Sequence, residues 1–205
     1  MKKFFAAAIL CTALSTSAAH AADVLADAAY DWSGFYSGIQ LGYSELDGTY
    51  FQDPAGNFDI KDSTIRFGSL SGYNFQSDNI VLGLESDTTF GTFSDITPLA
   101  RFKVGIESTV RARVGVAMDR VLPFVSAGVA LADANARRGG IGKESNYQLG
   151  FAAGAGIEFA ASDRIRLRAE YLYENYGKQK YDIGAFNDSA KWDQHVVRAA
   201  AIWAW

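Results

Sequence analysis

Apolar and polar side chains alternate along much of this chain with a period of two, and the alternation is clearest in the last segment, His195–Trp205. One face of this segment contains Arg198. The opposite face is wholly apolar and consists of Val197, Ala199, Ala201, Trp203 and Trp205. Because the side chains of a β-strand point alternately to opposite faces, this pattern predicts a strand with one side towards lipid and the other towards a lumen.

Seven more segments are predicted to be strands. Five of them alternate clearly: the chain near Phe35–Tyr43, Ile80–Phe90, Thr109–Met118, Tyr147–Phe159 and Ile165–Glu174. The other two, Thr64–Phe75 and Pro123–Asp133, are rich in Ser, Gly and Ala, and the sequence leaves their facing open. The segments are roughly ten residues long, which is the length of a tilted strand that crosses a bilayer.

The connections between these segments alternate in length. Three are short turns, at Gln76–Asn79, Asp119–Leu122 and Ala161–Arg164. Four are long and polar and are expected to be loops: Gly48–Ser63, Gly91–Ser108, Ala134–Asn146 and Gly177–Trp192. Outer-membrane barrels keep short turns in the periplasm and long loops outside the cell. The sequence therefore predicts an all-β fold, an eight-stranded antiparallel up-and-down transmembrane β-barrel with both termini in the periplasm.

The first residues have the pattern of a secretory signal peptide. Two lysines are followed by a mostly apolar stretch that is too short to span a membrane, and then by Ala19-His20-Ala21. Such a small-x-small sequence is typical of a cleavage site. We expect a signal peptide at 1–21, a short periplasmic segment at 22–31 and the barrel at 32–205. Because the single cysteine, Cys11, precedes the cleavage site, the mature chain should contain no disulfide or cysteine-bound metal.

Composition limits the classes of partner. Residues 1–21 contain two lysines and no acidic residue, so the mature chain carries 17 basic and 23 acidic side chains, a formal charge of −6. Nucleic-acid binding needs a basic patch, and so no nucleic acid is expected as a partner. Mean hydropathy is near zero, and after the signal peptide no apolar run is long enough for a transmembrane helix.

A soluble eight-stranded ligand carrier such as a lipocalin would show the same period, but it would place its apolar residues inside. Three features favour a membrane barrel. The predicted lumen face is rich in Gly, Ala and charges of both signs, aromatic residues gather near strand ends, and the chain stops on an aromatic residue. A narrow filled bore explains the first feature, and interfacial aromatic girdles explain the second. We therefore expect the bacterial outer membrane as the location, reached by signal-peptide-directed export.

Several short motifs resemble known outer-membrane families. The seventh-strand region of the OmpA-type barrel family is similar to the motifs Gly154–Phe159 and Arg166–Tyr171, which flank the turn Ala161–Arg164. The small outer-membrane surface antigens and porin-family proteins of alphaproteobacteria resemble this chain at Trp32–Tyr36, Gly72–Phe75 and Leu82–Glu85. The resemblance covers essentially the whole mature chain and implies an eight-stranded outer-membrane barrel. It implies little about activity, since relatives include adhesins, structural proteins, porin-like proteins and haemin binders.

Charged residues of both signs share the predicted lumen face: Glu85, Asp87, Arg111, Arg113, Glu158, Arg166, Arg168, Glu170 and Arg198. Two interpretations are an ion pathway and a network of ion pairs that fills the barrel. Eight strands leave a bore that side chains can fill, and buried charges need partners. The structural network is therefore favoured, while a small conductance through rearrangement of these pairs is left open.

His195 is the only histidine of the predicted mature chain. A catalytic histidine needs a nucleophile and an acid close by. Asp193 and Ser189 precede His195 in the sequence, but nothing in their spacing selects them. We therefore expect that the chain is not an enzyme and has no catalytic residue, metal site or cofactor, haem included.

The two ends of the predicted barrel suggest partners. Trp203 and Trp205 form a candidate insertion signal, and the resemblance implies that the outer-membrane assembly machinery recognises it. Arg137, Arg138 and Lys143 are candidates for contact with lipopolysaccharide phosphates or a host polyanion, although a solvated hairpin tip is the favoured interpretation. Outer-membrane lipid and lipopolysaccharide are the expected partners, and a host or small-molecule surface ligand is a further candidate.

The expected function is a structural, surface-exposed role in the cell envelope. The alternatives are a narrow porin-like channel, and a surface adhesin or haemin-binding protein that acts through the long extracellular loops, because loops on a rigid scaffold commonly carry function.

Overall fold

The computed structural model describes residues 30–96, 100–138, 142–183 and 186–205. All regular structure in these ranges is β-strand, and they contain no helix long and apolar enough to cross a membrane. The strands are β1 (Gly34–Gln52), β2 (Gly56–Ser77), β3 (Ile80–Phe90), β4 (Phe93–Ile96), β5 (Ala100–Val116), β6 (Val121–Arg138), β7 (Gly142–Ala160), β8 (Ile165–Ile183) and β9 (Phe186–Ala204). The predicted signal peptide lies outside the described residues.

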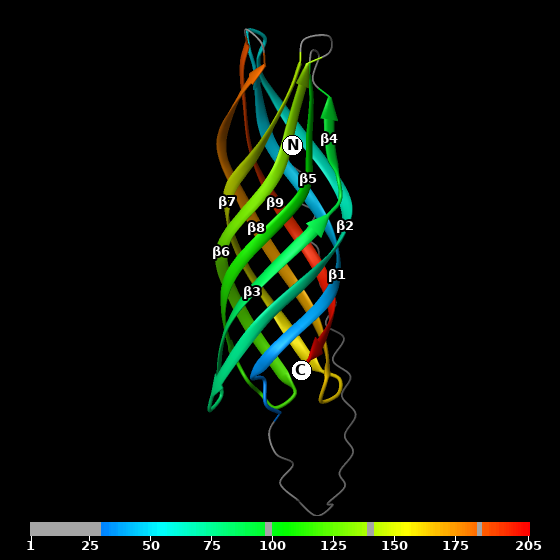
Figure 1. The fold of residues 1–205 in the computed structure, drawn as a ribbon, viewed down its shortest axis with the longest axis vertical. Helices are drawn as coiled ribbons and strands as arrows, with labels where there is room; N and C mark the ends of the chain where they lie inside the picture. Colours follow the sequence, from blue (N-terminus) through cyan, green and yellow to red (C-terminus); the bar gives the residue numbers. More distant parts are fainter. Residues whose placement is uncertain (1–29, 97–99, 139–141, 184–185) are drawn as a thin grey trace, which may run out of the picture.

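Antiparallel pairing closes the sheet into a barrel. Strands that follow one another in the chain pair as hairpins, with the exception of β3 and β4. Strand β3 pairs instead with β5, and β1 pairs with β9. The short strand β4 follows a break at Gly91 and Thr92 and pairs with the far end of β5. The eight long strands thus form the elongated barrel of tilted strands in Figure 1. The predicted fold class is confirmed.

The barrel wall is split at the end that lies away from the short turns. Strand β2 pairs with β3 through residues 67–77, whereas residues 57–66 have a partner strand on one side only, β1, within the described chain. Strand β4 lies near this part of β2, as Figure 1 shows, but its pairing is with β5. A seam therefore separates β2 from β4 above the closed part of the barrel.

The long polar segments are mostly strand, so the prediction that they are loops is wrong for most of their length. In the β1–β2 hairpin, for example, only residues 53–55 connect the two paired strands. Beyond the membrane, the outer face of a strand is in contact with water and can be polar. Neighbouring strands still provide hydrogen-bond partners for its backbone groups, so a polar segment can remain a strand. This correction applies to Gly48–Ser63, Gly91–Ser108, Ala134–Asn146 and Gly177–Trp192, of which residues 97–99, 139–141 and 184–185 lie outside the described chain.

The structure also settles the facing of the two strands that the sequence left open. On β2 the exposed outer residues include Ile65, Phe67, Tyr73 and Phe75, and the buried inner residues include Arg66, Leu70 and Asn74. On β6 the exposed outer residues include Val125, Val129 and Leu131, and the buried inner residues include Phe124, Ser126 and Ala130. Both strands therefore follow the same alternation as the rest of the barrel.

The outer face changes from apolar to polar at paired positions of three adjacent strands. Tyr43 on β1 pairs with Ile65 on β2 and with Val197 on β9, and all three are exposed. Two residues further along, Glu45 pairs with Ser63 and with His195. We call the part of the barrel on the Tyr43 side the membrane section, because its exposed face is the apolar band of a transmembrane barrel. The part that begins at Glu45 and its partners is the surface section.

The inner face changes in the opposite sense at the same place. On β1, the buried residues Gln40 and Ser44 are polar, whereas Leu46 and Tyr50 in the surface section are buried and largely apolar. An apolar cluster continues around the inside of the surface section and includes Ile60, Phe93, Val104, Tyr176, Tyr181 and Trp192. The membrane section therefore has a polar interior, and the surface section has an apolar core.

Candidate functional site

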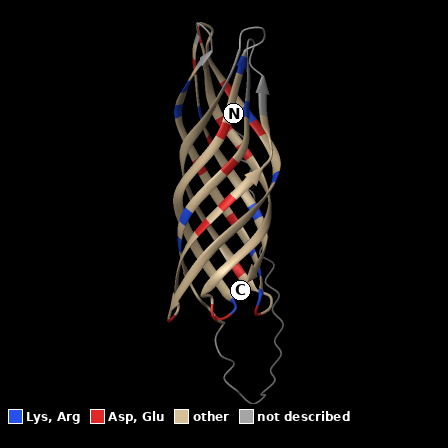
Figure 2. Cartoon of the chain, viewed as in Figure 1, with Lys and Arg blue, Asp and Glu red and all other residues tan. Residues whose placement is uncertain are grey.

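The interior of the membrane section contains eight of the nine charged residues that the sequence placed on the lumen face, gathered into one cluster. Strands β3, β5, β7, β8 and β9 supply them, and each is buried. The four acids and four bases are Glu85, Asp87, Glu158, Glu170, Arg111, Arg113, Arg168 and Arg198. We call this cluster the central network. Figure 2 shows that acidic and basic residues are interspersed along the strands in the middle of the barrel.

Arginines join the acids of the central network across the lumen. Arg168 binds Glu85 in a two-pronged way, with Nη1–Oε1 at 2.8 Å and Nη2–Oε2 at 2.6 Å. Arg111 Nη2 also contacts Glu85, at 2.8 Å. Arg198 lies 3.1 Å from Asp87 and 2.8 Å from Glu170. Charges of opposite sign are therefore balanced within the layer, as burial of charge requires.

Neutral side chains complete the central network. The Tyr36 hydroxyl donates to Glu85 at 2.8 Å, and the Thr109 hydroxyl donates to Asp87 at 2.5 Å. The guanidinium of Arg113 lies over the ring of Phe124, 4.1 Å from its centroid. Gly72 makes room for Tyr36, since a Cβ on Gly72 would lie 2.4 Å from the tyrosine oxygen. The sequence pattern did not identify these partners, because it shows facing but not contacts across the lumen.

Arg166, the ninth residue, belongs to a separate cap at the periplasmic end. Its Nε donates to the Tyr30 hydroxyl at 2.9 Å, and its guanidinium lies 4.9 Å from the ring centroid of Trp32. Trp32 is fully buried, and its Nε1 donates to the Asp119 carbonyl at 3.0 Å. The predicted periplasmic segment 22–31 thus contributes Tyr30 to the filling of the barrel, which the sequence did not indicate.

A second polar layer lies above the central network and was missed by the sequence. Arg66 donates a hydrogen bond to Glu107, and Gln194 donates to the other oxygen of Glu107 at 2.5 Å. Glu174 is buried beside them. A cavity of about 10 Å³ separates this layer from Arg198, which is space for roughly one water molecule.

The apolar core of the surface section closes the remaining length of the bore. Tyr176 and Trp192 stack with their ring centroids 5.0 Å apart, and both are almost fully buried. The Tyr50 hydroxyl donates to the buried Asp188 at 2.5 Å. The interior is therefore filled at four successive levels: the periplasmic cap, the central network, the Arg66 layer and this core.

Comparison with known proteins identifies the family. Residues 7–198 match the outer membrane protein beta-barrel domain. The chain belongs to this family. It is 34% identical over 169 residues to the 25 kDa outer-membrane immunogenic protein of Brucella abortus, with 82% of this chain and 77% of that protein covered. It is 32% identical to the 22 kDa outer membrane protein of Rhizobium leguminosarum bv. viciae, with 82% and 75% covered.

Solved structures show the same fold in other outer-membrane proteins. OprG from Pseudomonas aeruginosa superposes with a TM-score of 0.53 at 11% identity, over 82% of this chain and 96% of that chain. Neisserial surface protein A gives a TM-score of 0.50 at 16% identity, over 84% and 98%. The predicted resemblance to small outer-membrane barrels and the predicted location in the outer membrane are confirmed by the family and the relatives.

The three basic residues proposed for surface contact lie on one hairpin of this outer-membrane barrel. Arg137 is exposed near the end of β6, and the register pairs it with Lys143 of β7. Arg138 is paired with Gly142. The side chains of Arg138 and Lys143 lie outside the described part of the chain. The hairpin ends in the surface section, at the opposite end from the short turns.

His195 faces outward on β9, at the start of the surface section. Its Nδ1 lies 2.6 Å from the Tyr171 hydroxyl. Asp193 precedes it by two residues, and Ser189 lies six residues away on the same strand, which is a distance of about 20 Å for an extended chain. The structure therefore does not bring Ser189 together with His195.

The last two tryptophans lie on the outer face at the periplasmic end. Trp203 is 44% exposed and Trp205 is 81% exposed. The backbone N–H of Trp205 donates to the Phe35 carbonyl at 3.0 Å, which ties the chain end to the first strand. The role of both tryptophans as an insertion signal stays a prediction.

Proposed function

We propose that this outer-membrane barrel is a non-conducting structural component of the envelope that presents its surface section outside the cell. The observation that carries the proposal is the filled interior of the barrel. An ion would have to pass the cap around Trp32, the central network, the layer around Arg66 and the aromatic core around Trp192. A narrow porin-like channel is the alternative.

The energetics of the central network favour the structural role. To open a path, an arginine such as Arg168 must leave Glu85 and Glu158 while all three groups stay away from bulk water. Separation of a buried pair leaves uncompensated charge in a medium of low dielectric constant, which costs several kcal/mol. The core of the surface section adds a second barrier, since it is filled largely by apolar and aromatic side chains such as Tyr176 and Trp192.

Planar-bilayer recording on the refolded barrel tests the proposal. We expect no stable conducting state in the unmodified protein. The matched control is the double variant Arg111→Ser, Glu170→Ser, which leaves the net charge unchanged. It removes the 2.5 Å pair between the two residues together with their ion pairs to Glu85, Asp87, Arg168 and Arg198, and it should admit water to the central layer. It should show a higher conductance than the parent. Stable, voltage-independent conductance steps in the unmodified barrel would contradict the proposal.

We also propose that the barrel is not an enzyme. The separation of Ser189 from His195 along β9 supports this, because a histidine base must lie within hydrogen-bond reach of its nucleophile. The partners proposed for the barrel are outer-membrane lipid, lipopolysaccharide and the outer-membrane assembly machinery. The exposed Arg137 beside Lys143 on the β6–β7 hairpin supports contact with lipopolysaccharide phosphates.

A further inference from the structure

The outer face of the membrane section is interrupted by a patch of hydroxyl groups. Six side chains with the same outward facing as the lipid-exposed residues form it: Ser37, Ser69, Ser71, Ser86, Thr88 and Ser108. The register arranges them in two adjacent rows that run across four strands. Ser37, Ser71 and Ser86 form one row, and Ser69, Thr88 and Ser108 form the other. We call these six residues the hydroxyl patch.

The hydroxyl patch lies inside the apolar band rather than at its border. On the periplasmic side it is bounded by Phe35 and Tyr73, whose ring centroids are 4.8 Å apart. On the other side it is bounded by Phe67 and Phe90, at 5.7 Å. All four aromatic residues are exposed. The hydroxyl groups therefore face the hydrocarbon of the bilayer.

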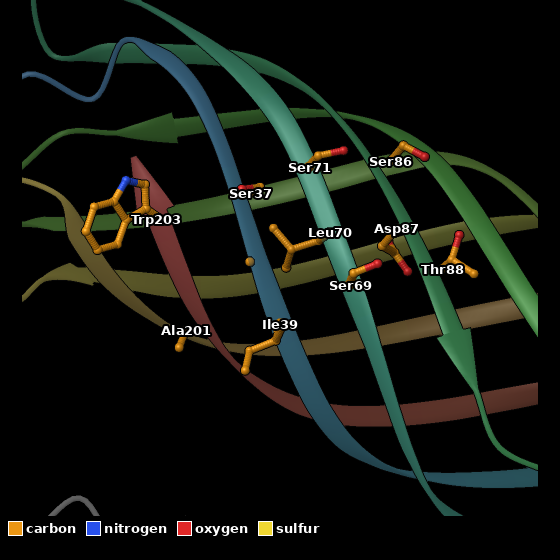
Figure 3. A pocket seen from close by; sticks show the side chains of 11 residues that line it. Ser37, Ile39, Ser69, Leu70, Ser71, Ser86, Asp87, Thr88, Ala201 and Trp203 are labelled. Carbon is orange, nitrogen blue, oxygen red and sulfur yellow. The ribbon is translucent and has the colours of Figure 1, made fainter. Parts of the chain in front are cut away.

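The small side chains of the patch leave a hollow in the outer wall of the barrel. The hollow has a volume of about 550 Å³ and extends over β1, β2, β3 and the end of β9. Figure 3 shows Ser69, Ser71 and Ser86 on neighbouring strands, with Trp203 at one side of the hollow. Neighbouring positions on the lipid face carry much larger side chains, such as Ile39 and Leu84.

Most of the hydroxyl groups lack a partner. Thr88 and Ser108 share a hydrogen bond of 3.0 Å. Within the described residues, the side chains of Ser37, Ser69, Ser71 and Ser86 form no hydrogen bond. A polar group in an apolar medium costs free energy unless it is hydrogen-bonded. Lipid tails offer neither donors nor acceptors, and a surface that carries polar groups at the same depth would satisfy these hydroxyl groups.

We propose that the hydroxyl patch is the interface through which two copies of this chain associate in the membrane. A hydroxyl group both donates and accepts, so a cluster of hydroxyl groups is complementary to itself. Two copies inserted in the same direction place their patches at the same depth, and a two-fold axis along the membrane normal brings them face to face. Small residues allow the two backbones to approach closely, and hydroxyl groups bond across such interfaces.

The first measurement counts subunits. The full chain carries one fluorophore and is reconstituted at low density in phosphatidylcholine bilayers, where single-molecule photobleaching gives the number of copies per spot. We expect mostly two-step bleaching. Ser69→Leu with Ser71→Leu fills the hollow with side chains that suit lipid and should reduce the dimer fraction at least fivefold. Ser69→Ala with Ser71→Ala keeps the hollow but removes two hydroxyl groups, and it should also weaken the dimer.

The second measurement locates the interface. With Cys11→Ala as the background, Ser71→Cys is oxidised in the outer membrane, and it should form a disulfide-linked dimer on a non-reducing gel. The matched control is Ala155→Cys, an exposed position on β7, four strands away around the barrel on either side. It should give several-fold less dimer. Each variant must keep its gel shift between unheated and boiled samples, so that a loss of dimer is not a loss of folding.

Three results would overturn the proposal. One is a monomeric parent protein in the bilayer. Another is a dimer that persists in both double variants, since the hydroxyl groups would then have no part in association. The third is capture of a different outer-membrane protein by Ser71→Cys in place of a second copy, because the patch would then belong to another interface.

Discussion

The membrane section and the surface section are built from the same strands, yet each is the reverse of the other. In the membrane section Leu41 and Val197 face outward and Arg198 faces inward. In the surface section Lys61 faces outward and Trp192 faces inward. The period of two holds within each section, and β-bulges interrupt it on two strands, between Val104 and Glu107 on β5 and between Tyr176 and Gln179 on β8. What reverses is the solvent: lipid surrounds one section and water surrounds the other, so the apolar side chains change sides, while ladders such as β1–β2 and β8–β9 continue through both sections.

The two sections are stabilised by different interactions. The inside of the membrane section is held by charge-assisted hydrogen bonds such as those between Arg168 and Glu85. The inside of the surface section is held by packing of apolar and aromatic side chains, as in an ordinary globular core. A substitution should therefore have opposite consequences on the two sides of the Tyr43 position.

The largest effect is expected from Glu85→Ala. This change leaves Arg111 and Arg168 buried without one of their acids, and removal of one partner of a buried ion pair costs about 3–5 kcal/mol. Urea unfolding of the refolded barrel, followed by tryptophan fluorescence, measures the loss. The control is Lys61→Ala in the exposed pair with Asp47, whose side chains are 68% and 56% exposed, where the loss should stay below about 1 kcal/mol. Equal losses in the free energy of unfolding for Glu85→Ala and Lys61→Ala would refute the difference between the buried network and the exposed pair.

An exchange of residues along the outer face of β6 should have the next largest effect. Val125 faces lipid and Arg137 lies on the same face in the surface section. Val125→Arg should lower the free energy of unfolding by about 2–4 kcal/mol, the usual cost of arginine in the middle of a lipid-facing strand. Arg137→Val should have little effect on stability. Comparable urea midpoints for the two variants would mean that the surface section does not begin between these positions.

The smallest effect is expected from the removal of one methylene group on β2. Ile60 is fully buried in the core of the surface section, whereas Ile65 is 69% exposed on the outer face. Ile60→Val should cost about 1 kcal/mol, as is usual in a packed core. Ile65→Val should cost less, because fluid lipid fills the space. Thermal unfolding of the two variants under identical conditions would compare them, and a larger loss at Ile65 would count against an apolar core above the membrane.

The facing of the membrane section could be predicted from the sequence because lipid imposes a strict alternation. The alternation alone shows which way each side chain faces in the run Val110, Arg111, Ala112 and Arg113, without any information about the adjacent strands. Contacts across the lumen could not be predicted in this way. Arg168 meets Glu85 although β8 and β3 are not paired, because barrel tilt and register decide which residues share a level.

The surface section and the Arg66 layer escaped prediction for two physical reasons. Serines of the hydroxyl patch alternate with Leu70 and Gly72 on β2, so the usual contrast between outer and inner faces is weak there, and Arg66 was not recognised as a lumen residue. Glu107 lies in a segment whose polarity suggested a loop. In water a strand is polar on the outside and apolar on the inside, and a scan for apolar outer faces does not detect it.

The seam between β2 and β4 has a consequence for motion. Residues 57–66 of β2 are paired with β1 on one side only. The protection of their amide groups against hydrogen exchange therefore depends on the packing of the surface section and not on a closed ring of strands. Segments of this kind open as separate cooperative units, with a free energy below that of global unfolding. The part of β2 beside the seam can then fluctuate on its own timescale, while the ring of paired strands within the bilayer keeps its shape.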